Sequence, residues 1–288
     1  MTRVDPTRGV VLALGGGGVR GVAHLGVLAE FERAGVEVIG IAGTSSGALM
    51  GALWLLSGAE PALRAVGTFA AAMSDGDAPD LEGSADRGGG PHLWARVRHA
   101  ATLLKAMAWG PPVSAKELVA RVAALLPDTS IEALPRPFAV VATDSATGAE
   151  VRLTRGPLRL AVAASSAMPG LAEPVLWDGR PLQDGGAVAE IPVGAARELG
   201  GPVVAVEVSE ALTPLDRGAG QVPKVLFRVA AMGWQELRRR ILAEADAVIA
   251  PAVNHLHWAD YGAIDAAVAA GRAAAREFMA GAGWRVGR

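Results

Sequence analysis

The sequence predicts an α/β protein with a three-layer α/β/α architecture and a mainly parallel central sheet. Apolar runs of strand length alternate with segments that repeat hydrophobic residues at helical spacing. Runs that are apolar along their whole length are typical of strands covered by helices on both faces. The 288 residues are 51% hydrophobic and 19% charged, which allows a sizeable core. We expect one domain over residues 1–288, with a cap or loop insertion at about 74–116.

The predicted elements follow one another along the chain in a regular order. We expect strands at residues 9–14, 36–43, 137–144, 150–154, 201–209 and 245–251. We expect helices at residues 19–35, 48–58, 92–109 and 158–168, and an alanine-rich helix after Asp260. Asp178-Gly179 predicts a hairpin turn between two short strands within residues 174–186.

The stretch from Val38 to Ala59 contains no charged residue and is long enough to cross a bilayer. Glycine, serine and threonine cluster near its middle, so a strand, a tight turn and a buried helix explain it better. The first residues, MTRVDPTRGVVLAL, lack the parts of a secretory signal. We therefore expect a cytoplasmic protein, with peripheral contact at the membrane as an open alternative.

The composition excludes several classes of protein. A net charge of −2 gives no global attraction to nucleic acid. The absence of cysteine excludes a disulfide scaffold and any thiolate metal site.

Gly43-Thr44-Ser45-Ser46-Gly47 is a G-x-S-x-G motif between an apolar run and a helical pattern. This is the context of a nucleophile elbow, a sharp strand-to-helix turn that exposes the serine. The flanking glycines leave room for the turn, and the following helix directs its N-terminal amides at the serine oxygen. A serine that only caps the helix explains the motif equally well.

Gly16-Gly17-Gly18-Val19-Arg20-Gly21 matches a dinucleotide-binding loop that follows a strand. Such a loop requires an acidic residue at the end of the second strand, where this chain has Gly43-Thr44-Ser45. The alternative is an oxyanion hole, in which the amides of residues 16–18 point at one oxygen. Arg20 would then add positive charge or fix the loop by hydrogen bonds.

Asp184 is the preferred candidate for the base that a nucleophilic serine needs. It precedes Gly185 and Gly186, which allow close approach of another loop or of a substrate. His255 and His257 offer the order serine, acid, histidine of an α/β-hydrolase. That fold places several strands before its nucleophile, whereas only one strand-helix unit is predicted before the motif.

Taken together, the three motifs resemble those of the patatin-like phospholipases in order, spacing and context. The resemblance extends to the segments VATDSATG, AASSAMPG and ADAVIAP, which are similar to the bacterial branch related to neuropathy target esterase. It covers nearly the whole chain. It implies that Ser45 attacks an ester and that Asp184 is its base, in a dyad without histidine. It also implies that the amides of residues 16–18, with Arg20 nearby, hold the oxyanion.

Two positions depart from the pattern of the resembled family. Gly15 stands where plant members often have aspartate, which concerns only the turn. Ala189-Glu190 replaces the Asn-Pro expected before Ile191-Pro192, and this changes how the loop after Asp184 is held.

The segment from Arg87 to Lys116 carries five basic residues and no acidic one, and the predicted helix within it has tryptophans near both ends. A cap that docks on anionic lipid is one interpretation. The favoured one is an ordinary helix with a solvated basic face. Arg238, Arg239 and Arg240 likewise predict a solvated helix face.

We therefore expect a hydrolase of lipid carboxylic esters that uses no metal and no cofactor. The substrate would be a phospholipid, a lysophospholipid or a related lipid, and the sequence indicates no oligomeric state. A histidine-dependent esterase and a non-catalytic lipid-binding or regulatory module remain as alternatives.

Overall fold

The computed structural model describes residues 9–75, 113–210 and 222–281. Its strands are β1 (Val10–Leu14), β2 (Val38–Thr44), β3 (Phe138–Asp144), β4 (Glu150–Leu153), β5 (Val175–Trp177), β6 (Arg180–Asp184), β7 (Val203–Val206) and β8 (Ala247–Ile249). They form one sheet in the order β5-β6-β3-β2-β1-β7-β8, with β4 paired to β3. The pairings from β3 through β2, β1 and β7 to β8 are parallel, and those that involve β4, β5 and β6 are antiparallel.

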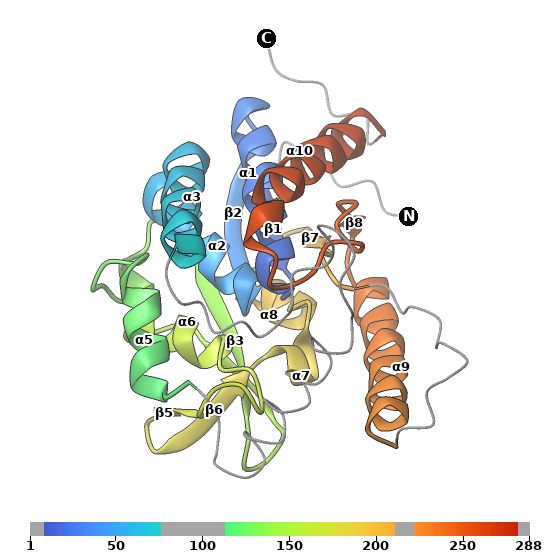
Figure 1. Cartoon of the computed structure of the whole chain (residues 1–288). Coiled ribbons are helices and arrows are strands. Elements are labelled where there is room, and N and C mark those ends of the chain that lie inside the picture. Colours follow the sequence, from blue (N-terminus) through green and yellow to red (C-terminus); the bar gives the residue numbers. More distant parts are fainter. Residues whose placement is uncertain (1–8, 76–112, 211–221, 282–288) are drawn as a thin grey trace.

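Helices cover both faces of this sheet, so the predicted three-layer fold is confirmed (Figure 1). The α-helices are α1 (Ala23–Arg33), α2 (Ser46–Ser57), α3 (Ala59–Asp75), α5 (Ala115–Ala123), α6 (Leu158–Ser165), α7 (Gly186–Ala189), α8 (Val193–Glu198), α9 (Val222–Ala243) and α10 (Ile264–Gly281). Residues of α1, α2, α3, α6 and α10 share the larger core with one face of the sheet. Residues of α7, α8 and α9 share the smaller core with the other face.

Strand β1 shows why the central runs are apolar at every position. Val10, Leu12 and Leu14 belong to the larger core, whereas Val11 and Ala13 belong to the smaller one. Side chains alternate between the faces of a strand, so a sheet covered on both faces buries all of them.

The predicted elements agree with the structure in type, with some shifted ends. The charge-free stretch from Val38 to Ala59 contains β2, a turn and α2, as expected. The hairpin turn lies at Asp178 and Gly179, whose φ angles of 48° and 79° are those of a tight primed turn. Helix α6 ends at Ser165 rather than at Met168.

Other parts of the chain were not predicted or lie outside the described residues. The sequence predicted no bounds for α3, α5, α7, α8 and α9. The predicted helix at 92–109 and most of the predicted insertion at 74–116 lie outside the described residues. No helix in the described ranges is long and apolar enough to span a membrane.

The register around β3 positions the candidate site. Val140 pairs with Gly43 of β2 and also with Leu153 of β4, so β2 and β4 lie at opposite edges of β3. Ala142 pairs with both β4 and Asp184 of β6, so β6 lies on the same edge as β2. β2 and β6 therefore pair with successive parts of the same edge of β3. This places Asp184 next to the turn that follows β2.

Candidate active site

Ser45 lies in the turn between β2 and α2, with φ 53° and ψ −121°. Asp178 is the other described non-glycine residue with positive φ. A backbone of this kind costs about 1–3 kcal/mol and persists only where the surroundings impose it. Ser45 occupies the N-cap position of α2, but its side chain accepts no hydrogen bond from the described first turn. The side chain therefore does not serve as a helix cap.

The glycines of the motif are required by close backbone contacts. A Cβ atom on Gly43 would lie 2.5 Å from the Cα of Ala48. A Cβ atom on Gly47 would lie 2.1 Å from the carbonyl oxygen of Leu14. Both distances are shorter than those that real Cβ atoms make. Glycine at position 43 therefore lets β2 lie against the first turn of α2, and glycine at position 47 lets the turn lie against the end of β1.

Asp184 lies at the end of β6 and is 7% exposed. The Ser45 side chain is close enough to its carboxylate to lower the pKa of Asp184 as a hydrogen-bonding neighbour. The Asp184 Oδ1 accepts a hydrogen bond from the Gly186 amide at 2.7 Å. Thr143 Oγ1 donates to the Asp184 carbonyl oxygen at 2.9 Å, which fixes the backbone on the other side. The structure thus brings together the two residues that the sequence analysis paired as nucleophile and base.

The electrostatic surroundings make Asp184 a stronger base than a free carboxylate. Burial raises the pKa of Asp184 to about 6, and the negative charge of Glu190 adds to this. The hydrogen bonds from Ser45 and from the Gly186 amide lower the pKa in the opposite direction. At neutral pH the carboxylate is ionised and can accept a proton.

Ser165 was not among the predicted site residues. Its Oγ accepts a hydrogen bond from the Ser45 amide at 2.8 Å and donates to the Val141 carbonyl oxygen at 2.5 Å. One buried hydroxyl thereby joins the strained turn to strand β3. No local pattern marks this role, because 120 residues separate Ser165 from Ser45.

The glycine-rich loop lies against Ser45. A Cβ atom on Gly16 would lie 3.4 Å from the Ser45 Cβ. The Gly16 amide donates to the Glu190 carbonyl oxygen at 2.9 Å, so this donor is already used. Gly18 has φ 59°, and a Cβ atom there would lie 2.3 Å from the Trp258 carbonyl oxygen. The predicted loop and the serine thus meet at the carboxyl edge of the sheet, as two adjacent parallel strands require.

Arg20 fixes the glycine-rich loop to the rest of the fold. Its Nη1 donates to the Leu256 carbonyl oxygen at 3.2 Å and lies 3.4 Å from Glu210 Oε2. Of the two roles weighed for Arg20, these contacts favour holding the loop. Gly21 leaves room for the next motif, since a Cβ atom there would lie 2.2 Å from Ser46 Oγ.

His24 holds the residue that precedes the glycine-rich loop. Its Nε2 lies 2.7 Å from the Gly15 carbonyl oxygen. Burial lowers the pKa of His24 to about 4, although the hydrogen bond to Gly15 acts in the opposite direction. The neutral ring therefore donates from Nε2 and holds the peptide that precedes Gly16.

His255 and His257 are exposed in the segment that follows β8. The His257 Nδ1 accepts a hydrogen bond from the Ala259 amide at 3.2 Å. The groups that hydrogen-bond the Asp184 carboxylate come instead from Ser45 and Gly186. This geometry favours the serine-aspartate pair over the histidine alternative. Within the described ranges, no three His, Asp or Glu side chains gather as metal ligands.

The expectation that Arg238 belongs to a solvated helix face was wrong. Arg239 and Arg240 are 69% and 70% exposed and pair with Glu236, as expected. The Arg238 side chain is 13% exposed and pairs with Glu190. Helical spacing explains the difference, because Arg238 lies three residues before Ile241, which packs against the smaller core, whereas its two neighbours point away.

A comparison with family models finds one match. The model described as patatin-like phospholipase matches residues 12–197, which include Ser45, Asp184 and the glycine-rich loop.

The similar proteins carry related descriptions. An uncharacterized NTE family protein of Mycobacterium tuberculosis is 34% identical over 190 residues, 64% of this chain and 44% of that protein. A second one is 30% identical over 298 residues, 93% of this chain and 46% of that protein. Neuropathy target esterase sws of Drosophila melanogaster is 30% identical over 68% of this chain and 13% of its own length. This chain thus spans less than half the length of these relatives.

Among solved structures, VipD from Legionella pneumophila matches 95% of this chain and 67% of its own chain. Its TM-score is 0.44 at 17% identity.

Proposed function

The chain belongs to the patatin-like phospholipase family, and on this premise we propose that it is a serine lipid acyl hydrolase. The substrates are carboxylic esters of phospholipids, lysophospholipids or related lipids. The observation that carries the proposal is that the Ser45 side chain neighbours the buried Asp184 carboxylate, at a serine held in a strained turn. Family membership contributes the lipid class of the substrate.

The first half of the reaction transfers the acyl group to the enzyme. Ser45 Oγ attacks the ester carbonyl carbon while its proton passes to Asp184. The tetrahedral intermediate then collapses, the bond to the alcohol oxygen breaks, and Asp184 returns the proton to the leaving alcohol. An acyl-enzyme on Ser45 and a free alcohol result.

The second half releases the acid. Water attacks the acyl carbonyl carbon and gives a proton to Asp184. The bond to Ser45 Oγ breaks as this oxygen recovers the proton from Asp184. The products are a carboxylic acid and the starting enzyme, so the cycle needs no external oxidant or cofactor.

The developing oxyanion needs hydrogen-bond donors that are already in place. Because the Gly16 amide donates to the Glu190 carbonyl oxygen, the oxyanion hole in this proposal relies on the amides of Gly17 and Gly18. The N-terminus of α2, which begins at Ser46, adds its positive end to the same place. Arg20 acts by holding the loop.

The test compares variants on a medium-chain p-nitrophenyl ester and on lysophosphatidylcholine. We expect Ser45→Ala and Asp184→Asn each to lose about a hundredfold or more in kcat. The matched control is a His255→Ala/His257→Ala double variant, which should keep wild-type turnover. Melting curves check that every variant is folded.

The remaining alternatives predict different results in the same assay. Turnover that survives in Ser45→Ala contradicts the proposal. Loss confined to the histidine double variant supports a histidine-dependent esterase. Lipid binding without turnover by the wild type supports a non-catalytic binding module.

A further inference from the structure

Arg238 uses all three nitrogens of its guanidinium in contacts with other elements. Nη1 lies 3.1 Å from Glu190 Oε2, in the segment after α7. Nε lies 3.1 Å from Glu207 Oε1, directly after β7. Nη2 donates to the Glu210 carbonyl oxygen at 3.3 Å. One buried side chain of α9 therefore joins two segments at the carboxyl edge of the sheet.

The same contacts reach both halves of the candidate active site. The backbone of Glu190 accepts a hydrogen bond from the Gly16 amide, while its side chain pairs with Arg238. The side chain of Glu210 pairs with Arg20 of the glycine-rich loop. Glu190 and Glu210, which both contact Arg238, thus each contact the glycine-rich loop as well.

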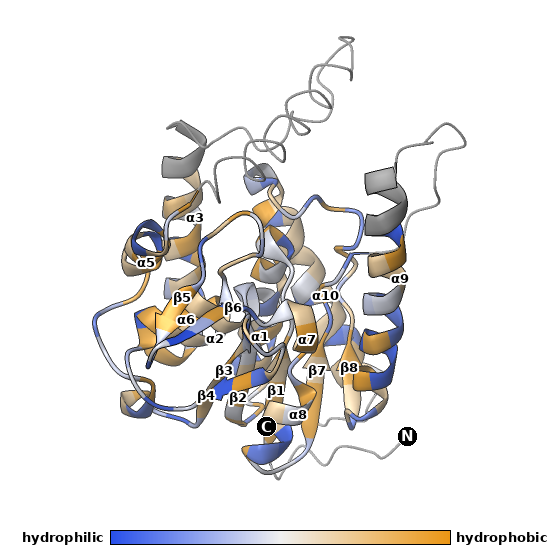
Figure 2. Cartoon of the chain, turned by 90° about the horizontal axis from the view of Figure 1, so that it is seen from below, coloured by the Kyte–Doolittle hydropathy of each residue, from blue (hydrophilic) through white to orange (hydrophobic). Residues whose placement is uncertain are grey.

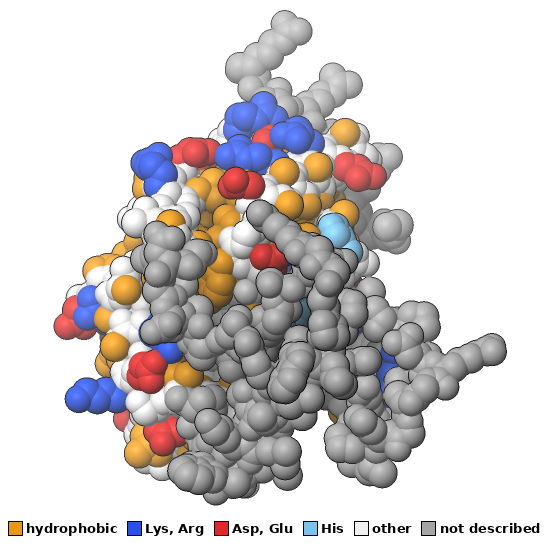
Figure 3. Space-filling model, in the orientation of Figure 1, with side chains coloured by type: hydrophobic (Ala, Val, Ile, Leu, Met, Phe, Trp, Pro, Cys, Tyr) orange, Lys and Arg blue, Asp and Glu red, His pale blue; other side chains and the backbone are white. Residues whose placement is uncertain are grey.

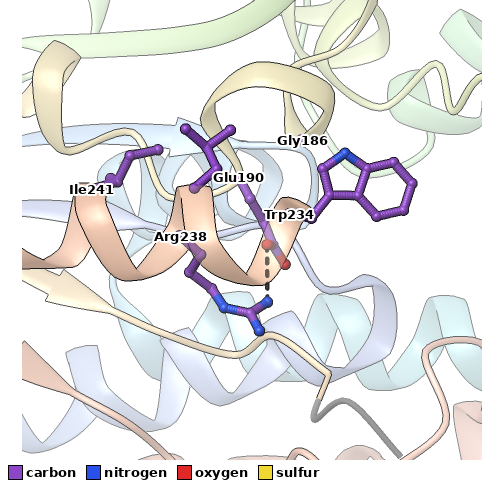
Figure 4. Close-up of a pocket in the computed structure, with 6 residues that line it drawn as sticks. Gly186, Glu190, Trp234, Arg238 and Ile241 are labelled. Atoms are coloured by element: carbon purple, nitrogen blue, oxygen red, sulfur yellow. Dashed lines mark hydrogen bonds and ion pairs between the residues drawn. The ribbon is translucent and has the colours of Figure 1, made fainter. Parts of the chain in front are cut away.

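Arg238 lies in a small pocket beside the candidate base (Figure 4). The pocket is lined by Gly186, Glu190, Trp234, Leu237, Arg238 and Ile241. Trp234, Leu237 and Ile241 contribute apolar side chains to the same pocket, and Figure 2 shows apolar and polar residues alternating along α9. The Arg238 side chain is 13% exposed, so water and salt screen its ion pairs less than those of an exposed arginine.

The charges around this pocket are unequal. Among the described residues, Glu190 and Glu207 contribute two carboxylates and Arg238 one cation. Burial raises the pKa of Glu207, Arg238 lowers it, and Glu190 raises it. Glu190 acts on Asp184 in the same direction. Without Arg238, these carboxylates would face one another with no cation between them.

We propose that Arg238 is a positioning residue that joins α9 to the segment after Asp184 and to the segment after β7, and offsets the charge of Glu190 beside Asp184. The proposal rests on the proposed function, because the offset affects the reaction only if Asp184 is the base. It also explains why Ala189-Glu190 replaces the expected Asn-Pro. Glu190 forms an ion pair with Arg238, and an Asn-Pro pair cannot form one.

The test measures kcat/KM against pH in Arg238→Gln and Glu190→Gln. Both variants break the same ion pair, but they change the charge near Asp184 in opposite directions. In Arg238→Gln we expect the midpoint of the acid limb to shift to a higher pH, by about half a pH unit to one pH unit. In Glu190→Gln we expect it to shift to a lower pH by a similar amount. Arg238→Lys keeps the charge and should restore the limb.

The control is Arg239→Gln, which removes an exposed arginine of the same helix and should leave the limb in place. If both ion-pair variants lose turnover equally and the acid limb of the profile stays at the same pH, the contact is only mechanical. That result overturns the electrostatic offset. Unchanged rates and unchanged limbs overturn the whole inference.

A second measurement separates this inference from the proposed function. Carbon-13 NMR follows the titration of the Asp184 carboxyl without turnover, and the signal is assigned by its loss in Asp184→Asn. Opposite shifts of its midpoint in the two variants support the inference even if the wild type hydrolyses no ester. Unmoved midpoints contradict the inference even if the wild type is an active hydrolase.

Discussion

In the proposed reaction, Asp184 must be ionised before it can take the Ser45 proton, and its burial opposes that ionisation. The pKa of Asp184 is raised to about 6, so the active fraction of enzyme falls as the pH drops below that value. We expect kcat/KM to decrease about tenfold per pH unit on the acid side of this midpoint. A rate profile between pH 4.5 and 8 checks this. A profile that stays flat down to pH 5 argues against Asp184 as the base.

The same raised pKa makes Asp184 unfavourable for stability at neutral pH. Between about pH 4 and pH 6 the unfolded chain ionises this carboxyl and the folded chain does not, so stability falls as the pH rises. We therefore expect Asp184→Asn to raise the free energy of unfolding by about 2 kcal/mol at pH 7.5. Urea unfolding at two pH values measures this difference.

The gain should shrink towards pH 4, where the carboxyl is protonated in the folded chain and about half protonated in the unfolded chain. A gain that is equal at pH 4 and pH 7.5 would show that packing, and not ionisation, is responsible. Stability gained at the expense of activity is the usual result of replacing a strained or buried functional group.

At the scale of the elements, the turn after β2 depends on α6 as well as on its own residues. Ser165→Ala leaves the Ser45 amide and the Val141 carbonyl without their present partner. We expect a loss of about 1–3 kcal/mol of stability. We also expect kcat to fall about tenfold or more with little change in KM, because the nucleophile moves while substrate contacts remain.

The matched control is Ser166→Ala, the next residue along the chain and only half-buried. It should retain wild-type kcat and stability. If both variants behave alike, the hydroxyl of Ser165 has no special part in positioning Ser45.

The elements most readily predicted from the sequence are those whose pattern is local. β1 and β2 are continuous apolar runs, and Asp178-Gly179 identifies its own turn. Ser45 and Asp184 were predicted as site residues because the glycines near each of them indicate close contact between backbone segments. The contacts of Ser165 and Arg238 depend on residues far away in the sequence, so no local pattern identified them. The inward position of Arg238 is the part that helical spacing from Ile241, three residues later, does indicate.

At the scale of the whole molecule, the two ends of the described chain pack against each other. Figure 1 shows α10 beside α1, and Figure 3 shows basic and acidic side chains together over this region. Glu30 of α1 is 2% exposed and bonds Arg33 Nε and Arg276 Nη1, each at 2.9 Å. Burial raises the pKa of Glu30, but the arginines together hold it below its ordinary range. The buried carboxylate thus ties the C-terminal helix to the first strand-helix unit.

We expect Glu30→Gln to lower the free energy of unfolding by about 1–2 kcal/mol. The value is modest because Arg33 and Arg276 are 64% and 53% exposed and stay solvated when the carboxylate is removed. The folded variant should keep its ester hydrolysis, since the ion pairs of Glu30 are with arginines of α1 and α10 and with none of the candidate site residues. Glu37→Gln, at an exposed position, is the control. A loss of turnover without a loss of stability would contradict this separation of roles.

The sheet topology was predictable to the level of layers but not of strand order. Alternating strands and helices indicate a parallel sheet, and this is what β1, β2, β3, β7 and β8 form. The placement of β6 beside β3, where β2 ends, depends on a pairing that no periodicity reveals. This placement brings Asp184 to Ser45, so the pairing of the two residues came from the family resemblance and not from spacing.

The central claim is that Ser45 is the nucleophile and Asp184 its base, and covalent labelling tests it most directly. The protein is incubated with a p-nitrophenyl alkylphosphonate, and the site and rate of labelling are measured by mass spectrometry. We predict one phosphonyl group per chain, on Ser45, with labelling at least about a hundredfold slower in Asp184→Asn and unchanged in the His255→Ala/His257→Ala variant. Labelling of another residue, or labelling of Ser45 at an unchanged rate in Asp184→Asn, would contradict the account.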